Sequence, residues 1–573
     1  MKRLLKHIRG YGWSTVLGPL FKLLEATLEL IVPLVIAKIV DVGIAGGDHS
    51  YILNMCLVLV LLGVVGLAFS VTAQYLCAHA SVGFITRVRE EMFSHIGRLS
   101  YTDLDRLGTP TLITRMTTDT QRVQTGLNLT LRLLLRSPFV VFGAMIMAFS
   151  IDAQSGATFA VTIPALSVVI FGIMLITTPL FKKVQSGVDR ILARTRENLS
   201  GARVVRAFAR EDDEVAAYRA ENEELTTSQK RAGHISALLN PLTYVIINLG
   251  IIFLIYVGAI RVDLGELSQG EVLALYNYMS QILVELIKLA NLIISITKAL
   301  ASSSRISSVL AVTPSQSFGE VKVGIPDAPA VEMRGVSLKY SGAGDYSLSG
   351  VSFTAKKGET VGVIGGTGSG KSTLINLIPR FYDATEGEVL IFGVPAAEYA
   401  EGVLCDTVSV VPQRAVLFSG ELRDNLRWRN PGATDEELYR ALEIAGAREL
   451  VMEKGGLSIK CEGGGKNFSG GQRQRLTIAR ALVGEPKILI LDDSTSALDY
   501  ATDLKVRTAL RTLRDTTVFI VSQRTASVMS CDKIIVLEDG APVAIGTHEE
   551  LLLASTVYRE IYDSQFMGGD DYE

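Results

Sequence analysis

Residues 360–373 read Thr-Val-Gly-Val-Ile-Gly365-Gly366-Thr367-Gly368-Ser369-Gly370-Lys371-Ser372-Thr373. A short β-branched run passes directly into a glycine-rich loop of the form G-x-x-x-x-G-K-[ST], and an apolar helical pattern follows. Glycines let backbone N–H groups approach phosphates, and the helix N-terminus adds partial positive charge. Lys371 is expected to meet the β and γ phosphates of a nucleotide and Ser372 to bind magnesium. A dinucleotide-binding interpretation is weaker, because such loops do not continue into Lys-Ser.

Two segments downstream extend this prediction. Phe468, Ser469, Gly470, Gly471 and Gln472 open a helical stretch whose glycines offer backbone N–H groups to an anion. The apolar run 488–491 then ends in Asp492, which suits a metal-associated carboxylate at the end of a parallel strand. Similar Val/Ile-rich runs at 359–364, 408–411 and 517–521 alternate with helical stretches, which predicts a largely parallel α/β domain.

The half of the chain before this domain has a different composition. Of the 573 residues 48% are hydrophobic, and the excess lies before about residue 300. Six stretches reach the ~20 residues that a helix needs to cross a bilayer. They lie at about 14–40, 51–79, 127–150, 156–180, 241–261 and 270–296. The sequence therefore predicts an all-α membrane domain of six spans.

Positive charge orients these spans. The connections after spans two and four are long and rich in Arg and Lys, whereas the opposite connections are short and almost free of them. Because Lys and Arg are retained in the cytoplasm, the long connections, both termini and the α/β domain are expected to be cytoplasmic in a multi-pass plasma-membrane protein. The spans are expected to continue as helices into the cytoplasm.

Domain boundaries follow from these changes in composition. We expect a transmembrane domain at 1–310, a Pro-containing linker at 311–330, a nucleotide-binding domain at 331–565 and an acidic tail at 566–573. The basic N-terminus lacks a cleavage site, so no removable signal peptide is expected. The five cysteines show no metal-ligand spacing and are expected to be free thiols. A net charge of only -3 argues against nucleic acid as a partner.

The order and spacing of the motifs resemble an ABC transporter half-molecule of the exporter type, over essentially the whole chain. Walker A lies at 365–373, the Q-loop at Gln413, the signature at 468–472, Walker B ends at Asp492 and the D-loop runs from Ser496 to Asp499. In this chain the spans and the ATPase domain are fused, as in exporters, which disfavours an importer. The six spans exclude a soluble ABC ATPase.

The resemblance implies the ligands and their contacts. ATP and Mg²⁺ are the expected cofactors, with Ser372, Gln413 and Asp492 near the metal and Tyr340 stacked on adenine. Two ATPase domains are expected to enclose two ATP molecules, each between the Walker A loop of one and the signature of the other. Coupling to the spans is expected through residues 101–118 and 207–214.

Two positions depart from the family pattern. Asp493 stands where the family usually has a Glu that polarises the attacking water, and Gln523 stands where it has a His near the γ phosphate. The first change retracts a carboxylate by one methylene, about 1 Å, which can cost roughly 100-fold in rate. The second leaves a hydrogen-bond donor that carries no charge. Both changes weaken the same catalytic site, although tolerated drift in an active homodimer is the simpler alternative.

The pattern resembles the degenerate-site subunit of heterodimeric bacterial multidrug exporters. It implies an unlike half-transporter as partner, which supplies Glu and His at the corresponding positions, while the intact signature Ser469-Gly470-Gly471-Gln472 completes the partner's site. The expected substrate is a small amphipathic compound, with multidrug export as one form. A lipid or peptide translocator and a regulatory ATP-sensing subunit are the alternatives.

Charged residues within the predicted spans are the only clues to the substrate. Glu25 and Glu29 lie four apart in the first span, and Glu285 and Lys288 lie three apart in the sixth. Carboxylates at membrane depth should face a cavity or a partner. For Glu25 and Glu29, a cation-accepting cavity, pairing between helices and a position near the lipid head groups all fit the sequence. Glu285 and Lys288 can neutralise each other.

Overall fold

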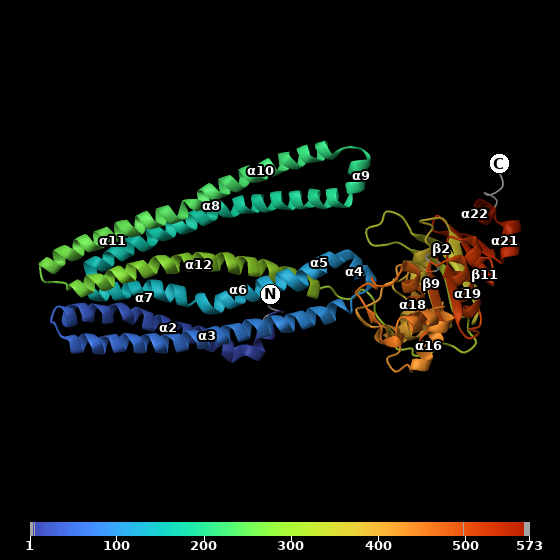
Figure 1. The fold of residues 1–573 in the computed structure, drawn as a ribbon, viewed down its shortest axis with the longest axis horizontal. Helices are drawn as coiled ribbons and strands as arrows, with labels where there is room; N and C mark the ends of the chain where they lie inside the picture. The colour runs from blue at the N-terminus through green and yellow to red at the C-terminus, as the bar shows by residue number, and fades with distance from the viewer. Residues whose placement is uncertain (1–3, 5, 495, 497, 567–573) are drawn as a thin grey trace. The chain divides into compact units, whose positions relative to one another are not determined.

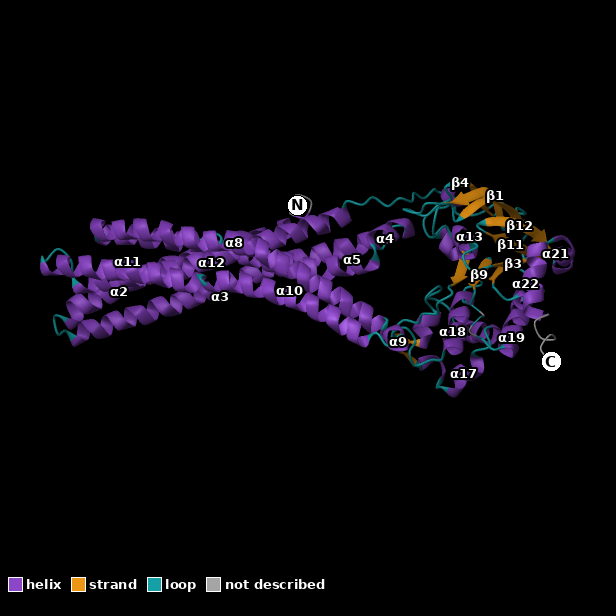
Figure 2. Cartoon of the chain, turned by 90° about the horizontal axis from the view of Figure 1, so that it is seen from above, coloured by secondary structure: helices purple, strands orange, loops and turns teal. Residues whose placement is uncertain are grey.

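A computed structural model describes residues 4, 6–494, 496 and 498–566. Its chain divides into two compact units, Met1–Gly97 with Pro110–Val312 and Arg98–Thr109 with Thr313–Glu573. Each unit is described by itself. Figures 1 and 2 show that the first unit is helical and that the strands lie in the second. The predicted tail at 566–573 lies outside the described residues apart from Phe566.

The first unit is built from helices, several of them far longer than a bilayer requires. They are η1 (Lys6–Tyr11), α2 (Gly12–Lys38), η2 (Ile39–Ile44), α3 (His49–Ile96), α5 (Thr109–Thr114), η3 (Arg115–Asp119), α6 (Thr120–Leu133), α7 (Arg136–Ile151), α8 (Ala153–Ser200), α9 (Ala202–Ala207), α10 (Glu211–Ala237), α11 (Leu239–Asp263) and α12 (Gln269–Leu310). α3 and α8 have 48 residues each, so the predicted continuation of spans beyond the bilayer is confirmed.

Five helical segments among the described residues are long and apolar enough to cross a membrane. They are His49–Ile96, Thr109–Ile151, Ala153–Ser200, Glu211–Asp263 and Gln269–Leu310. α2 covers most of the predicted first span but contains Lys22, Glu25 and Glu29, which make it too polar for the same criterion. The first of the six predicted spans therefore stays a prediction.

Two kinds of surface explain how these helices pack. Leu53, Leu57 and Leu61 project from one side of α3 and are exposed, as expected for side chains that face lipid. The interior contains many small residues, among them Ala26 and Ala144, which let backbones approach closely. Both Ala side chains are completely buried in a cluster with residues of α2, α7, α8, α11 and α12.

The described part of the second unit contains one largely parallel sheet and two smaller antiparallel sheets. The larger sheet has the order β12-β11-β3-β10-β9-β6, and every neighbouring pair is parallel except β11 with β12. Its strands are β3 (Thr360–Gly365), β6 (Val408–Val411), β9 (Ile488–Asp492), β10 (Thr517–Val521), β11 (Lys533–Glu538) and β12 (Ala541–Gly546). The predicted parallel α/β domain and its four strand segments are confirmed.

The other strands form two small antiparallel sheets. The four-stranded one has the order β2-β1-β4-β5, from β1 (Val331–Leu338), β2 (Leu348–Ala355), β4 (Glu386–Ile391) and β5 (Val394–Pro395). The two-stranded one pairs β7 (Gly420–Glu421) with β8 (Lys460–Cys461).

Helices surround the sheets and are mostly short. They are α4 (Tyr101–Leu107), α13 (Lys371–Leu377), η4 (Ala396–Glu398), α14 (Val403–Thr407), α15 (Leu422–Leu426), α16 (Asp435–Ile444), α17 (Arg448–Glu453), η5 (Gly456–Ser458), α18 (Gly470–Leu482), α19 (Tyr500–Leu510), α20 (Thr525–Val528), α21 (His548–Ala554) and α22 (Thr556–Phe566). In β9, Leu489 and Leu491 enter one buried cluster and Ile488 and Ile490 another, so both faces of the parallel sheet are covered.

α4 comes from the first long connection of the chain, yet it groups with the second unit. The Tyr101 ring lies 4.7 Å from that of Phe381, and the Tyr382 hydroxyl donates a 2.6 Å hydrogen bond to Asp105. Burial opposes ionisation of Asp103, but hydrogen bonds from Ser315 and Ser100 hold the pKa of its carboxyl below the ordinary value. This short helix is thus fixed by stacking and by polar bonds.

Candidate nucleotide-binding site

The candidate site lies at the carboxyl ends of four neighbouring parallel strands. The glycine-rich loop follows β3, Gln523 follows β10, Asp493 follows β9 and Gln413 follows β6. These strands are neighbours in the order β3-β10-β9-β6, and Val521 pairs with Asp492 at the shared edge. Loops at this edge of an α/β sheet form ligand sites, so the fold brings the predicted residues together.

The glycines of the loop meet strict space limits. A Cβ on Gly365 would lie 2.2 Å from the Leu537 carbonyl oxygen, and Gly370 has φ +92° with the Ser347 carbonyl oxygen 2.7 Å from the position of its Cβ. Only glycine adopts such a backbone without strain. The loop then turns directly into α13, whose first residue is Lys371.

Lys371 lies over its own loop. Its Nζ donates to the carbonyl oxygens of Gly365 at 2.9 Å and Gly366 at 2.5 Å. Burial lowers the pKa of the Lys371 ammonium, and the carboxylates of Asp493 and Asp492 oppose that shift. Phosphate oxygens are stronger partners for an ammonium than neutral carbonyl groups. The side chain is therefore placed to exchange these bonds for a phosphate.

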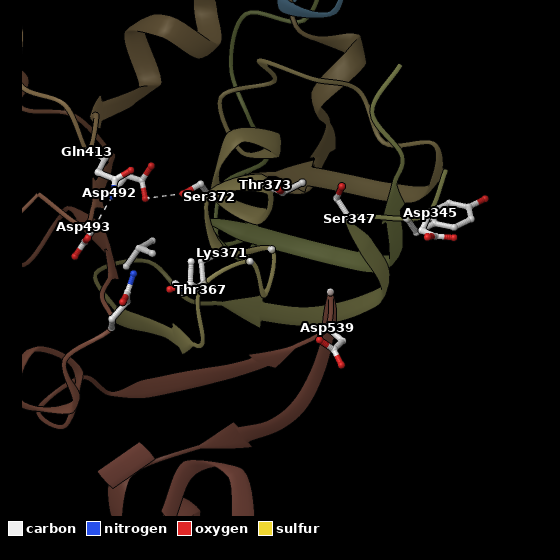
Figure 3. A pocket seen from close by; sticks show the side chains of 16 residues that line it. Asp345, Ser347, Thr367, Lys371, Ser372, Thr373, Gln413, Asp492, Asp493 and Asp539 are labelled. Atoms are coloured by element: carbon white, nitrogen blue, oxygen red, sulfur yellow. Dashed lines mark hydrogen bonds between the residues drawn. The ribbon is translucent and has the colours of Figure 1, made fainter. Parts of the chain in front are cut away.

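Two of the three predicted magnesium ligands, Ser372 and Asp492, are in contact, and the third, Gln413, lines the same cavity. The Ser372 hydroxyl donates a 3.1 Å hydrogen bond to the Asp492 carboxylate, as Figure 3 shows. Burial raises the pKa of Asp492; the Ser372 bond opposes this shift, the neighbouring Asp493 adds to it and Lys371 opposes it. Hydroxyl and carboxylate oxygens are the ligands that Mg²⁺ prefers. The donor set therefore fits a magnesium ion shared with nucleotide phosphates.

Asp493 occupies a tight turn directly after β9. Its φ is +43°, and its backbone N–H donates to the Val521 carbonyl oxygen at 3.0 Å. The Gln413 amide lies 3.5 Å from the Asp493 carboxylate, a long hydrogen bond (Figure 3). Burial raises the pKa of Asp493, and Gln413, Lys371 and Arg524 oppose the shift. Because the chain turns here, the direction of this carboxylate is set by the backbone.

These residues line one cavity of about 570 Å³. The predicted residues that line it are Thr367, Gly368, Gly370, Lys371, Ser372, Thr373, Gln413, Asp492, Asp493 and Gln523. Gly365, Gly366 and Ser369 belong to the same loop without lining the cavity. The other lining residues, which sequence analysis did not single out, are Asp345, Tyr346, Ser347, Val521, Asp539 and Gly540. Val521 ends β10, and no motif marks the other five because they come from connections that meet the glycine loop only in the folded domain.

Tyr340, the residue predicted to stack on adenine, and Tyr346, a tyrosine of the cavity wall, are placed differently. Tyr340 does not line the cavity; its hydroxyl donates to the Thr373 hydroxyl at 3.2 Å, and its ring contacts that of Tyr382 edge-on at 5.0 Å. Tyr346 lines the cavity and donates a 2.9 Å hydrogen bond to Glu386. Tyr340 is thus next to the loop, with a second tyrosine at the cavity wall.

The signature residues do not line this cavity. Ser469 caps the N-terminus of α18, where it accepts from the Gln472 N–H, and Gln472 bonds back to the Ser469 N–H. Gly470 and Gly471 form the first turn of the helix. A capped, exposed helix start of this kind offers backbone N–H groups to an anion on another molecule.

The D-loop leads into α19. Asp499 caps that helix through a 2.9 Å bond from the Thr502 N–H and is exposed. Ala497 of the predicted D-loop lies outside the described residues. Like the signature, Asp499 does not line the cavity.

The loop that carries Gln523 is held from two sides. The Gln565 side chain of α22 donates to the Gln523 carbonyl oxygen at 2.9 Å and accepts from the Thr525 N–H at 2.8 Å. Arg507 of α19 donates to the Ala526 carbonyl oxygen at 2.8 Å and forms a buried ion pair with Asp503. The first of these supports was missed in the sequence, since a Gln near the chain end carries no local signal.

The charged residues of the predicted spans form pairs. Glu25 pairs with Lys22, and Glu285 pairs with Lys288 at 2.8 Å. Glu29 pairs with Arg136 of α7, which was not among the candidates. Pairing between helices is therefore supported for Glu29 and Glu285, which both bond to Arg136, whereas Glu25 pairs within its own helix.

Comparisons with known proteins match both units. The family model of the ABC transporter transmembrane region matches residues 15–286, and that of the ABC transporter ATPase domain, described as ABC transporter, matches residues 348–496. An uncharacterized ABC transporter ATP-binding protein of Mycobacterium tuberculosis (strain CDC 1551 / Oshkosh) is 37% identical, with 98% of this chain and 97% of that protein covered.

More distant relatives cover much of the chain as well. The uncharacterized ABC transporter ATP-binding protein YfiB of Bacillus subtilis (strain 168) is 33% identical over 99% of each chain. The ATP-dependent lipid A-core flippase of Desulfotalea psychrophila is 30% identical over 83% of this chain and 84% of its own. A solved bacterial Atm1-family ABC exporter with ATP bound shares the fold, with a TM-score of 0.76, 23% identity and coverage of 100% and 99%.

Motif order, sheet topology and these matches agree. The chain is a multi-pass membrane protein with a cytoplasmic domain that binds ATP, and it is a half-transporter of a kind that dimerises. The chain belongs to the ABC transporter family, as an ATP-driven exporter half in which a helical transmembrane domain precedes the ATPase domain.

Proposed function

We propose that this exporter half carries a degenerate ATP site and works with an unlike half-transporter to move small amphipathic compounds out of the cytoplasm or the inner leaflet. Its domains are proposed at 1–310 and 331–565, joined by the linker 311–330. The observation that carries the proposal is that Asp493 and Gln523 line the same cavity as the phosphate loop.

Asp493 is poorly suited to the task of a water-polarising Glu. Its side chain is one methylene shorter, and the turn at φ +43° sets its direction from the backbone. A displacement of about 1 Å at a reacting group can cost roughly 100-fold in rate. Gln523 adds a second deficit, because an amide donates a hydrogen bond to a γ phosphate without supplying a charge. With two deficits in one cavity, bound ATP is expected to be hydrolysed slowly and to stay in the site for a long time.

The residues that bind ATP retain their chemistry. We assign Lys371 to the β and γ phosphates, Ser372 and Asp492 with Gln413 to Mg²⁺, and Tyr340 to the adenine. The magnesium ion would supply charge neutralisation at the phosphates. The loop geometry and the 3.1 Å contact between Ser372 and Asp492 support the assignments of Lys371, Ser372 and Asp492, whereas those of Gln413 and Tyr340 rest on the family resemblance.

The signature supports a role at a second site. Ser469 and Gln472 bond reciprocally at the start of α18, which leaves a rigid helix N-terminus outside this chain's own cavity. We assign Ser469, Gly470, Gly471 and Gln472, with Asp499, to the ATP held by the partner half. Movement would reach the spans through residues 101–118, which include α4, and through residues 207–214.

The test is ATP hydrolysis by the purified chain, alone and mixed with its candidate partner half. Negligible hydrolysis alone and robust hydrolysis in the mixture are expected. The double variant Asp493→Glu with Gln523→His should raise hydrolysis by the lone chain by about 100-fold if that chain forms a homodimer. Brisk hydrolysis by the unaltered lone chain would overturn the proposal.

A pair of variants in the mixed complex sharpens this test. Ser469→Arg places a large cation at the helix start that serves the competent site, and hydrolysis should fall by about 100-fold or more. Lys371→Ala affects only the degenerate site and should cost less than tenfold. Equal losses would mean two equivalent sites.

Lipid translocation is the second candidate, and one comparison favours it. The relative named as a lipid A-core flippase is 30% identical over 83% of this chain. Stimulation of hydrolysis by lipids but not by soluble amphipathic compounds would select this candidate over the first.

A further inference from the structure

Three helices bring four charged side chains together inside the transmembrane unit. Arg136, at the start of α7, donates a 2.5 Å bond to Glu29 of α2 and a 2.7 Å bond to Glu285 of α12. Lys288 adds a 2.8 Å bond to Glu285. α2, α7 and α12 pack against one another (Figure 1). We call Glu29, Arg136, Glu285 and Lys288 the charged cluster.

The cluster has a buried centre and two accessible ends. Arg136 is 6% exposed and Glu285 4% exposed, and Glu285 also accepts a 2.8 Å bond from the Ser137 hydroxyl. The side chains of Glu29 and Lys288 are 46% and 42% exposed. Arg136 and Glu285 therefore form the fixed centre, with one carboxylate and one ammonium at the accessible ends.

The accessible ends retain unused hydrogen-bonding capacity. In the described structure Glu29 has one bonding partner, Arg136, and Lys288 has one, Glu285. A carboxylate can accept about four bonds and an ammonium can donate three. The Nε of Arg136 and the Oε1 of Gln281 are buried without any hydrogen-bond partner among the described residues. Buried polar groups are normally satisfied, so the two unpartnered atoms of Arg136 and Gln281 are open to a polar ligand in the cavity, as are the exposed ends of Glu29 and Lys288.

All four charged residues line a cavity of about 380 Å³. Its polar wall also contains Asn277, Ser280 and Gln281, and its apolar wall contains Val32, Pro33, Val140 and Val284. Glu29, Arg136 and Glu285 all lie well inside the predicted spans. Ionisable groups at membrane depth that face a cavity mark a ligand pathway.

We propose that the charged cluster and its cavity form a binding site for an amphiphile with a zwitterionic head group. Two carboxylates and two cations give a formal net charge of zero. A purely cationic or purely anionic head could bond to only one of the two accessible ends. A head with both charges satisfies Glu29 and Lys288 together, and its chain lies on the valine and proline wall. The inference deepens the proposed function, on which it rests, by naming the substrate class.

Two sources supply such a head group. A membrane lipid such as phosphatidylethanolamine carries it, and so does a soluble zwitterionic amphiphile. The shared chemistry is an ammonium and an anionic group on one short head, attached to a hydrocarbon chain.

The experiment measures binding of three probes of equal chain length to the full chain in nanodiscs of phosphatidylglycerol, without ATP. The probes are hexadecylphosphocholine, hexadecyltrimethylammonium and hexadecyl phosphate. The zwitterion should bind about tenfold more tightly than either singly charged probe. Nanodiscs that also contain phosphatidylethanolamine separate the sources. If phosphatidylethanolamine competes with hexadecylphosphocholine, the natural ligand is a lipid head group. If it does not compete, the natural ligand is a soluble amphiphile. Either result keeps the zwitterionic head as the ligand chemistry.

Two variants invert the selectivity without stranding a buried charge. Glu29→Gln gives the cluster a net positive charge and should shift preference to hexadecyl phosphate, while Arg136 stays paired with Glu285. Lys288→Gln gives a net negative charge and should shift preference to hexadecyltrimethylammonium. Each should weaken binding of the zwitterion by about tenfold. Lys298→Gln, at an exposed position of α12 outside the cavity, is the matched control and should change nothing.

Wild-type binding that does not favour the zwitterion would overturn the inference, as would variants that affect all three probes equally. Transport is measured separately in proteoliposomes of the mixed complex. A complex that binds the zwitterion with the expected selectivity but does not move it with ATP would refute the proposed function and leave the binding site intact.

Discussion

The nucleotide cavity and the charged cluster are both polar sites, but the chain builds them in opposite ways. The cavity gathers short motifs that end neighbouring strands, so each motif carries its chemistry in consecutive residues. In the cluster, Arg136 donates hydrogen bonds to Glu29 and Glu285, which lie 107 and 149 positions away in the sequence. No local pattern marks Arg136. The difference teaches that chemistry carried by consecutive residues can be predicted from the sequence, whereas chemistry assembled by helix packing becomes visible only in the structure.

Removal of the central cation should break the cluster most severely. Arg136→Gln leaves Glu29 without its one bonding partner and weakens the support of the buried Glu285, and loss of one partner of a buried ion pair costs about 3–5 kcal/mol. We expect a marked fall in the melting temperature of the detergent-solubilised chain. The conservative control is Arg136→Lys, which keeps the charge. Equal melting temperatures for wild type and Arg136→Gln would contradict a structural centre.

A substitution in the nucleotide cavity tests whether ATP binding there is independent of ligand binding at the charged cluster. Lys371→Ala removes a charge-assisted contact to phosphate and should weaken ATP binding by about 10-fold to 100-fold. Binding of the zwitterionic probe to the cluster should not change. Titration with a fluorescent ATP analogue measures the first quantity. Lys356→Ala, at an exposed position outside the cavity, controls for general loss of charge. ATP affinity that matches wild type would contradict the assignment of Lys371.

The two tyrosines test how far a motif can be trusted within the cavity. Tyr340→Ala should weaken ATP binding by about tenfold, because stacking on a base contributes roughly 1–3 kcal/mol. Tyr346→Ala should have a smaller effect, since its hydroxyl is bonded to Glu386. The same ATP titration compares both variants. A larger loss of affinity for Tyr346→Ala would show that adenine stacks on Tyr346 at the cavity wall and not on Tyr340, the position expected from the family.

The smallest expected effect concerns Gln565. Gln565→Ala removes two hydrogen bonds from the loop of Gln523, each contributing about 1 kcal/mol. Because the Arg507 bond to Ala526 remains, we expect hydrolysis by the mixed complex to change by less than about threefold. Gln565→Glu is a useful companion, since a carboxylate can still accept from Thr525 but cannot donate to the Gln523 carbonyl oxygen. A loss as large as that of Lys371→Ala would contradict a supporting role.

Sequence alone predicted the parts of this molecule that depend on local pattern. The strand segments at 408–411 and 517–521 match β6 and β10, and Lys371, Asp492, Asp493 and Gln523 meet at one cavity as expected. These predictions succeed because strand periodicity and loop glycines act over a few residues.

The rest depended on tertiary contacts. The partner of Glu29 proved to be Arg136, whose place at the start of α7 cannot be read from neighbouring residues. Tyr346 and Asp539 reach the cavity only when the β1–β2 and β11–β12 connections fold beside the glycine loop. The charged residues of α2 likewise keep a hydropathy criterion from identifying this helix as a membrane span.

The placement of α4 has a practical consequence for protein engineering. Residues 101–105 come from the first half of the gene, yet the Tyr101 ring contacts that of Phe381, and Asp103 and Asp105 accept hydrogen bonds from Ser315 and Tyr382. A recombinant ATPase domain cut at the linker would lose this helix and expose an aromatic surface to solvent. Chimaeras between exporters that exchange domains at the same point would join a foreign helix to that surface. Successful exchanges should carry residues 98–109 together with the ATPase domain that they fit.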